Sequence, residues 1–249
     1  MDTIYNNIKS AIKENKKLLA VLIDPDKVKV ENLGKFTQKI NQSIATHIFV
    51  GGSTVEENET ENVVVELKKH TKLPIILFPG DVIQITDKAD GILFLSLISG
   101  RNPDYLIVKH VEAVPKLFKS GLEVIPTGYI LIENGKETSV ECVSKTKPIA
   151  NDNIETIINT AKAGEYLGQK LIYLEAGSGA THPVNGNIIS EVKKRLGVPL
   201  IVGGGIRTKE ALDLAYNSGA DLVVIGTAFE EDERFFEDIK SPLSAKADI

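Results

Sequence analysis

The sequence predicts a single (β/α)8 barrel of the TIM type, and three observations support this fold class. The chain has 249 residues, of which 42% are hydrophobic and 25% are charged, so it can build one large buried core. Eight apolar runs recur along it, and 249 divided by eight gives about 31 residues, enough for one strand and its crossover helix. No linker or shift in composition divides the chain, so we expect one domain over residues 1–249.

Each of the eight runs is rich in Val, Ile and Leu and has the length of a strand that is buried on both faces. Their regular order along the chain predicts parallel strands that close into a cylinder. The predicted strands span residues 18–23, 46–51, 73–78, 90–96, 122–132, 170–175, 198–204 and 220–226.

Between the strands, apolar residues recur at three- and four-residue spacing, which predicts amphipathic helices. We expect these helices over residues 30–43, 56–70, 103–120, 153–168, 186–196 and 208–218. Asp152 followed by Glu155 is typical of a pair that caps the start of a helix. Residues 79–89 are too few for a full crossover helix, so the third helix is expected to be degenerate, a loop or one or two turns.

Two segments lie outside this alternation. Near the N-terminus, Ile4, Ile8 and Ile12 share one helical face, which predicts a helix that closes the bottom of the barrel. After the fifth strand, residues 133–147 are polar and contain an Asn-Gly pair, which predicts an excursion that forms a hairpin.

Charge and cysteine content exclude several classes of protein. Lysine and arginine total 29 against 34 aspartate and glutamate residues, a formal net charge of −5, which argues against a nucleic-acid-binding protein. The single cysteine, Cys142, cannot form an internal disulfide, and this fits a reducing cytoplasm. No apolar run approaches the ~18 residues that a membrane-spanning helix needs.

In a barrel of this kind the active site lies at the carboxyl ends of the strands, so the residues there are the first candidates. The first strand ends in IDPDK, where Asp24 offers the carboxylate oxygens that magnesium prefers. The second ends in VGGST, where Ser53 or Thr54 presents a hydroxyl beside the same site. Each residue also has a structural explanation, an Asx-type turn at Asp24 and a helix cap at Ser53.

The sixth strand ends in YLEAGSGA, with Glu175 at its last position. Burial of an unpaired carboxylate is costly, so Glu175 is expected to meet a cation, a hydrogen-bond donor or a substrate. Within reach of a hydroxyl it could accept a proton. An ion pair that fixes a loop is the structural alternative.

The clearest feature is a pair of glycine-rich turns after the last two strands, VGGGIRT at residues 202–208 and VIGTAFE at residues 224–230. Such turns expose backbone N–H groups, which can hold a phosphate beside a helix N-terminus. Backbone amides also explain how an acidic chain binds phosphate. The alternative is that these glycines only help to close the barrel.

In combination, the motifs IDPDK, IFVGGSTV, GYILI, YLEAGSGA, IVGGGIRT and VIGTAFE resemble the geranylgeranylglyceryl phosphate synthase family, whose bacterial relatives include heptaprenylglyceryl phosphate synthases. The resemblance runs over residues 18–230. It implies a magnesium-dependent transferase that moves the prenyl group of a long-chain prenyl diphosphate to the 3-hydroxyl of sn-glycerol 1-phosphate. Geranylgeranyl diphosphate is the expected donor. It further implies a cytoplasmic enzyme of lipid biosynthesis, a homo-oligomer (dimer or hexamer) and transient contact with a membrane surface.

The resemblance also assigns roles to residues at the strand ends. Asp24 and Ser53 match the magnesium positions of the family. Glu175 is the implied general base, which takes the proton of the acceptor hydroxyl. The acceptor-binding residues are implied to be Tyr173, Leu174, Glu175, Ala176, Gly177, Ser178 and Gly179 at the glycerol end and Gly204, Gly205, Gly226 and Thr227 at the phosphate.

The chain departs from the family pattern at two points. Many relatives carry lysine two residues before the aspartate of the first motif, where Leu22 stands here. Cationic help to the diphosphate must then come from elsewhere, and Lys27 and Arg101 are the candidates. The loop AGSGATHPV also differs from the YSGTYGNP-like loop of other members, which affects the glycerol contacts more than the chemistry.

Two other functions fit parts of the sequence. One is a different phosphate-binding barrel enzyme, either an aldolase or a sugar-phosphate isomerase. An aldolase needs a Schiff-base lysine, which none of the eight strand ends supplies, whereas a metal-free isomerase could use Asp24 and Glu175 as its acid and base. The other is a non-catalytic phosphate-binding scaffold, which has no need of Asp24, Ser53 and Glu175 together.

Overall fold

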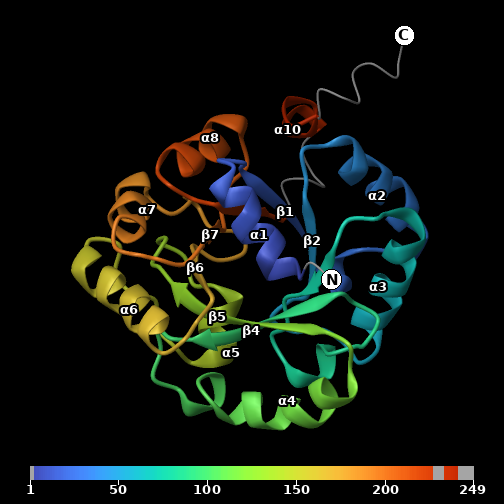
Figure 1. Cartoon of the computed structure of the whole chain (residues 1–249), viewed down its shortest axis with the longest axis horizontal. Helices are drawn as coiled ribbons and strands as arrows, with labels where there is room; N and C mark the ends of the chain where they lie inside the picture. Colours follow the sequence, from blue (N-terminus) through green and yellow to red (C-terminus); the bar gives the residue numbers. More distant parts are fainter. Residues whose placement is uncertain (1–2, 227–232, 241–249) are drawn as a thin grey trace.

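The fold is a closed barrel of eight parallel strands surrounded by helices (Figure 1). This computed structural model describes residues 3–226 and 233–240 of the chain. Each strand pairs with its neighbours in chain order, and β8 pairs with β1 to close the cylinder. The predicted (β/α)8 barrel is therefore confirmed.

Every predicted strand segment contains an observed strand, because continuous apolar runs suit strands that are covered on both faces. The first prediction matches the observed bounds, and most of the others are one or two residues too long at their ends. The strands are β1 (Leu18–Ile23), β2 (His47–Val50), β3 (Ile75–Leu77), β4 (Gly91–Leu97), β5 (Glu123–Leu131), β6 (Leu171–Glu175), β7 (Leu200–Gly203) and β8 (Leu222–Ile225).

The six predicted crossover helices are all present, each within one predicted segment. They are α2 (Leu33–Gln42), α3 (Glu59–His70), α4 (Val108–Lys119), α6 (Ile154–Tyr166), α7 (Gly186–Lys193) and α8 (Lys209–Asn217). After β8 the chain forms α10 (Glu233–Asp238). Residues 79–89 form the short 3-10 turn η3 (Val82–Gln84) where a regular barrel has its third helix, so the degenerate third crossover is confirmed.

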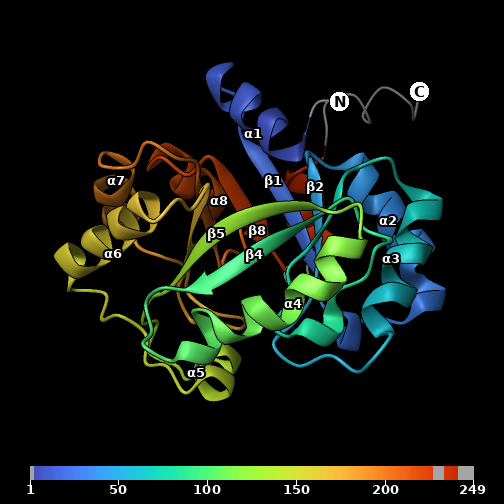
Figure 2. The ribbon, with the colours of Figure 1, turned by 60° about the horizontal axis from the view of Figure 1, so that its bottom comes forward.

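The bottom of the barrel is closed by α1 (Ile4–Lys13), as the isoleucine spacing predicts. Ile4 and Ile8 are buried among the side chains that fill the barrel interior. The carboxylate of Glu123, at the start of β5, accepts hydrogen bonds from the backbone N–H groups of Ile4 and Tyr5 and so caps the helix. Figure 2 shows α1 at one end of the barrel and α5 (Ser139–Ser144) at the other.

The predicted hairpin within residues 133–147 is wrong, because the segment forms the short helix α5. The hydroxyl of Thr138 accepts a hydrogen bond from the backbone N–H of Glu141 and caps this helix, while the Glu141 carboxylate pairs with Lys147. The expected cap of α6 is also displaced by one residue. Asn153, rather than Asp152, accepts the capping hydrogen bond.

One arrangement of three residues occurs twice, on opposite sides of the barrel. In each case an aspartate just before a strand accepts a hydrogen bond of 2.8 Å from the first residue of the preceding strand and pairs with a lysine of the helix that leads into that preceding strand. The members are Lys68, Ile75 and Asp90 around β3 and β4, and Lys193, Leu200 and Asp221 around β7 and β8. Since β3 and β7 are four strands apart in a ring of eight, half a turn of the barrel relates the two sites.

Candidate functional site

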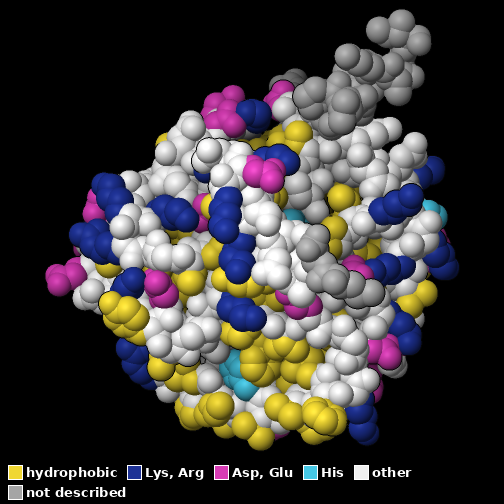
Figure 3. Space-filling view, in the orientation of Figure 1, with side chains coloured by type: hydrophobic (Ala, Val, Ile, Leu, Met, Phe, Trp, Pro, Cys, Tyr) yellow, Lys and Arg dark blue, Asp and Glu magenta, His cyan; other side chains and the backbone are white. Residues whose placement is uncertain are grey.

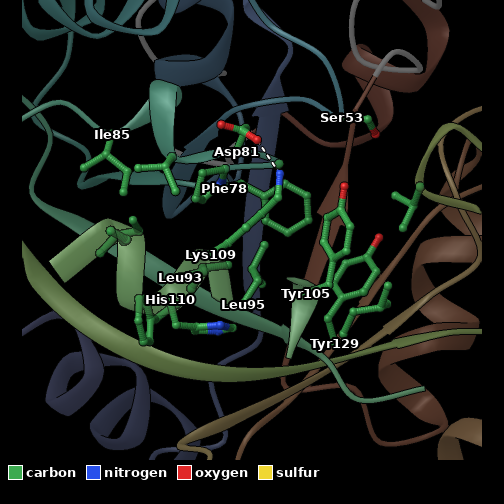
Figure 4. Close-up of a pocket in the computed structure, with 18 of the residues that line it drawn as sticks. Ser53, Phe78, Asp81, Ile85, Leu93, Leu95, Tyr105, Lys109, His110 and Tyr129 are labelled. Carbon is green, nitrogen blue, oxygen red and sulfur yellow. Dashed lines mark hydrogen bonds and ion pairs between the residues drawn. The ribbon is translucent and has the colours of Figure 1, made fainter. Parts of the chain in front are cut away.

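Two connected cavities open at the carboxyl ends of the strands. The first, which we call the mouth cavity, is polar and lies over the ends of β1, β2, β6, β7 and β8. The second, which we call the apolar groove, runs along β4 between α4 and the short third crossover (Figure 4). Ser53, Phe78 and Tyr129 are among the residues that line both. The missing third helix leaves the space that the groove occupies.

Most of the acceptor and metal residues expected from the sequence line the mouth cavity together. They are Asp24, Ser53, Tyr173, Glu175, Gly177, Ser178, Gly179, Gly204, Gly205 and Gly226. Leu174 and Ala176 do not line it, because side chains alternate along a strand and these two are buried in the outer core beneath the helices. Thr227 lies outside the described residues.

Asp24 follows the last residue of β1 and stands at the rim of the mouth cavity. Its carboxylate accepts a hydrogen bond from the backbone N–H of Asp26 and forms an ion pair of 2.8 Å with Lys27. The turn after β2 passes very close, since a β-carbon at Gly52 would lie 2.7 Å from an Asp24 carboxylate oxygen. Asp24 therefore makes the expected Asx-type turn and also faces the cavity.

The carboxylate of Asp24 and the hydroxyl of Ser53 determine which metal ion could bind at the rim of the mouth cavity. Among the described residues, no three His, Cys, Asp or Glu side chains are grouped so that they could hold a metal ion. Magnesium is commonly held by one or two carboxylates, with water and substrate phosphates completing its shell. Asp24 and Ser53 thus fit a magnesium ion that arrives with a diphosphate, rather than a metal centre built wholly from protein.

Glu175 is the buried carboxylate of the mouth cavity, and only 6% of the residue is exposed. One carboxylate oxygen accepts a 2.6 Å hydrogen bond from the backbone N–H of Gly177. The Tyr173 hydroxyl lies beside the carboxylate, poorly aligned for a regular hydrogen bond but close enough to stabilise its charge. Burial outweighs both effects and raises the pKa of Glu175 to about 7, so this group can exchange a proton near neutral pH.

The glycines that follow β7 make room for Glu175. A β-carbon at Gly203 would overlap the Tyr173 hydroxyl and lie 3.1 Å from a carboxylate oxygen of Glu175. A β-carbon at Gly204 would overlap the other carboxylate oxygen, and Gly204 has a φ of +84°, a backbone conformation that residues with side chains rarely adopt. Gly205 has a φ of +71°. Part of the glycine pattern therefore serves packing around the carboxylate, in addition to any contact with phosphate.

Three aromatic rings form a cluster where the cavities join. The ring centroids of Phe78, Tyr129 and Tyr173 lie 5.2–6.0 Å apart. Burial and the nearby charge of Glu175 raise the pKa of both tyrosine hydroxyls well above the ordinary value, so they stay protonated. Tyr129 was not singled out as a site residue from the sequence, although it stands in the GYILI motif.

Of the two cations that the sequence offers for binding the diphosphate, the structure places only one at the site. Lys27 lines the mouth cavity, whereas Arg101 lines neither cavity and donates hydrogen bonds to the backbone oxygens of Ile98 and Gly100. Arg101 is therefore not a residue of this site. Arg207, which the sequence interpretation missed, lines the mouth cavity next to the glycine-rich turn after β7.

The chain matches the family model of the PcrB family over residues 10–243. It is 60% identical over 233 residues to a geranylgeranylglyceryl phosphate synthase of Zunongwangia profunda, with 94% of this chain and 99% of that protein covered. It is 57% identical over 237 residues to the synthase of Flavobacterium johnsoniae, with 95% and 98% covered.

Solved structures of the same kind are also similar. The crystal structure of (S)-3-O-geranylgeranylglyceryl phosphate synthase from Thermoplasma acidophilum, in complex with its substrate sn-glycerol-1-phosphate, has a TM-score of 0.89 at 32% identity and covers 96% of this chain and 99% of that chain. The wild-type GGGPS of Thermoplasma volcanium also has a TM-score of 0.89, at 34% identity, and covers 95% of this chain and 96% of that chain.

Replacement of Glu175 by glutamine is expected to stabilise the fold more at pH 8 than at pH 5. The folded chain holds the Glu175 proton up to a pKa of about 7, against 4.5 for an ordinary glutamate, so ionisation of the native carboxyl costs stability as the pH rises between these values. At about 1.36 kcal/mol per pKa unit, the difference is on the order of 3 kcal/mol. Urea unfolding of wild type and Glu175→Gln at the two pH values measures it.

Glu191→Gln is the matched control for this experiment. Hydrogen bonds with Lys194 and Arg195 lower the pKa of Glu191 to about 2, so this exposed carboxylate is ionised at both pH values. Its replacement should therefore change the free energy of unfolding equally at pH 5 and pH 8. A pH-independent effect of Glu175→Gln would contradict the raised pKa of Glu175.

Proposed function

This chain belongs to the PcrB family, and we propose that it transfers a prenyl group from a prenyl diphosphate to glycerol phosphate. The observation that carries the proposal is the junction of a polar cavity, which holds a buried carboxylate, with an apolar groove. A polar acceptor and a long apolar donor need two such compartments with their reactive ends side by side. Two relatives that are 57% and 60% identical to the chain are geranylgeranylglyceryl phosphate synthases, which supports the same reaction.

The proposed acceptor is sn-glycerol 1-phosphate, bound in the mouth cavity. Backbone N–H groups of the turns that carry Gly204, Gly205 and Gly226 would hold its phosphate, with the charge of Arg207 nearby. Its 3-hydroxyl would then face Glu175. The structural relative from Thermoplasma acidophilum was crystallised with this substrate, which supports the choice.

The proposed donor is a long-chain prenyl diphosphate, and geranylgeranyl diphosphate is the first candidate. The apolar groove offers its tail a mostly apolar lining, supplied by β4, by Ala113 of α4 and by Val140 and Val143 of α5. Its diphosphate would lie where the groove meets the mouth cavity, beside Ser53. This arrangement brings the allylic carbon to the acceptor hydroxyl.

Positioning and charge would carry most of the catalysis. Magnesium held by Asp24 and Ser53, when bound, would neutralise the diphosphate as it leaves. The bond between the allylic carbon and the diphosphate oxygen breaks, and its electron pair departs with the diphosphate. The acceptor oxygen forms the new ether bond, and its proton passes to Glu175, whose pKa of about 7 suits a general base.

The apolar groove also bears on the alternative functions. A sugar-phosphate isomerase acts on a small polar substrate and has no use for an apolar channel that opens beside its acid and base. A phosphate-binding scaffold needs neither the groove nor a buried carboxylate whose pKa is near 7, since burial of such a group costs stability. Prenyl transfer uses all of these features.

Oligomer formation, contact with a membrane and a cytoplasmic location remain predictions. In the described part of the chain, no helix has both the length and the apolar character needed to cross a membrane. Exposed apolar side chains gather on α4, along the lower edge of the molecule in Figure 3. They include Ile107, just before the helix, and Val111, Val114 and Phe118, the last with 87% of the residue exposed. This is the face on which self-association should first be sought.

The reaction itself is tested by incubating the chain with magnesium, labelled glycerol phosphate of each stereochemistry and prenyl diphosphates of graded length. We expect a prenyl ether only from sn-glycerol 1-phosphate and mainly from long donors, because the groove extends along most of β4. Chromatography of the labelled product measures it. Failure to form any prenyl ether would contradict the proposed function.

Glu175→Gln is expected to lower turnover by ~10²–10⁴-fold, the usual range for loss of a general base. In the wild-type chain, kcat/KM should rise with pH through a pKa near 7 as Glu175 loses its proton, and this rise should be absent in the variant. Calorimetry of sn-glycerol 1-phosphate binding is the control, because the phosphate turns are unchanged. Unchanged turnover would remove Glu175 from the mechanism.

Asp24→Asn is expected to weaken the magnesium dependence and the turnover of the donor, while binding of sn-glycerol 1-phosphate is spared. Magnesium titrations of the initial rate measure the first effect, and calorimetry measures the second. Asp26→Asn is the matched control, since its carboxylate also borders the mouth cavity but accepts a hydrogen bond from the backbone of Glu56. A larger loss in the control, or lost acceptor binding in Asp24→Asn, contradicts the assignment.

A further inference from the structure

An ion pair lies inside the otherwise largely apolar groove. The ammonium group of Lys109, in the first turn of α4, is bonded to the carboxylate of Asp81, which follows β3 in the short third crossover (Figure 4). The surrounding groove is lined by side chains such as Phe78, Ile85 and Leu93. A tail-binding groove gains nothing from charge, so the pair calls for a reason other than recognition of the tail.

Stability alone does not account for the pair. The side chains of Lys109 and Asp81 are 27% and 40% exposed, and partly exposed ion pairs contribute little to stability. Burial lowers the pKa of Lys109, but the hydrogen bond and charge of Asp81 outweigh it and raise that pKa, so the ammonium stays charged. Lys109 also lies over the ring of Tyr105, 4.9 Å from its centroid.

The two partners differ in how firmly they are held. Asp81 caps the turn η3, where its carboxylate accepts a 3.2 Å hydrogen bond from the backbone N–H of Ile83. Lys109 is held at its tip by Asp81 and by the ring of Tyr105, on a stem of four methylene groups. The carboxylate is therefore the fixed member of the pair and the ammonium the one free to move to another anion.

The pair stands at the end of the groove that joins the mouth cavity. The amide of Gln84, a buried residue of η3, donates a 2.8 Å hydrogen bond to the backbone oxygen of Gly52 and accepts one from the N–H of the same residue. This locks the third crossover, with Asp81, against the turn that carries Ser53. Both Ser53 and Lys109 line the groove.

The position also mirrors the expected phosphate site. The repeated aspartate–lysine arrangement relates the β3–β4 edge to the β7–β8 edge by half a turn of the barrel. The glycine-rich turns lie at the carboxyl ends of β7 and β8, and Asp81 and Lys109 lie near the carboxyl ends of β3 and β4. Two anions held at these edges would face each other across the mouth.

Resting on the proposed function, we propose that Lys109 binds the diphosphate of the prenyl donor and takes the place of the lysine that is absent at Leu22. Asp81 is then a positioning residue, which holds the ammonium at the end of the groove until the more highly charged diphosphate displaces it. Lys27 is paired with Asp24, the expected metal ligand, and it lines the mouth cavity only, whereas Lys109 lines the groove that would hold the tail. The diphosphate accordingly lies between Ser53 and Lys109, with the tail in the groove.

The test is calorimetric titration of inorganic pyrophosphate into the full chain, without magnesium and with sn-glycerol 1-phosphate at saturation to fill the other phosphate site. Lys109→Met should weaken pyrophosphate binding by about ten-fold or more, the effect of losing a charge-assisted hydrogen bond. Asp81→Asn should leave binding unchanged or tighten it, because it removes the anion that competes for Lys109. Lys109→Arg should restore most of the affinity.

Lys116→Met is the matched control, since Lys116 lies on the same helix and bonds the backbone oxygen of Val82 at 3.1 Å. Its pyrophosphate affinity should equal that of wild type. In turnover, Lys109→Met should raise the KM for the prenyl diphosphate and leave the KM for sn-glycerol 1-phosphate unchanged.

A purely structural ion pair predicts a different outcome, in which Lys109→Met and Asp81→Asn lower the thermal stability alike and leave pyrophosphate affinity equal. That result would overturn the proposal, as would absence of pyrophosphate binding to the wild-type chain or equal weakening by both variants. These failures are distinct from failure of the proposed function, which shows as absence of prenyl transfer by the wild-type chain.

Discussion

The buried carboxylate of Glu175 is the constraint around which the mouth of the barrel is arranged. The register of β6 and β7 sets Glu175 opposite Gly203, and a residue with a side chain there could not share the space with Tyr173. The turn after β6 in turn supplies the Gly177 N–H that satisfies one carboxylate oxygen. In the proposed function, backbone amides of the same glycine-rich turn would hold the phosphate of the acceptor. The small residues that permit burial of Glu175 would then also serve phosphate binding.

The second determinant is something the fold leaves out. A barrel with eight full crossover helices covers every strand on its outer side. Here the turn η3 covers little of β3 and β4, and the apolar groove fills the gap. The buried side chain of Gln84 keeps this shortened crossover in place through its hydrogen bonds to Gly52. The regular crossovers flank the mouth cavity, and the shortened third crossover leaves the groove that is proposed to take the prenyl tail.

The sequence predicts the strands well because each is mainly an apolar run rich in Val, Ile and Leu, and it predicts much of the mouth because parallel strands end at one rim. It does not predict features that depend on distant side chains. Asp81 and Lys109 are 28 residues apart and belong to no local motif, so only the folded chain brings them together. The hairpin expected in residues 133–147 is wrong because the Asn-Gly pair does not decide the local structure, whereas the hydroxyl of Thr138 caps a helix that begins at Ser139. Strand alternation alone would have excluded Leu174, whose neighbours Tyr173 and Glu175 face inward.

The distribution of charge explains how a chain with a net charge of −5 can bind two anionic substrates. Its cations at the cavities are few and separately placed, with Lys27 and Arg207 at the mouth and Lys109 at the end of the groove. Lys27 and Lys109 are each held by a carboxylate in the structure, at Asp24 and Asp81. A carboxylate beside each of these cations balances its charge before a ligand binds, and a metal ion or a phosphate can then exchange with one member of the pair. The electrostatic attraction for the substrates is therefore short-ranged and limited to particular positions at the rim. A transferase of this kind has to hold two anionic substrates in one opening, and separate cationic positions allow it to do so.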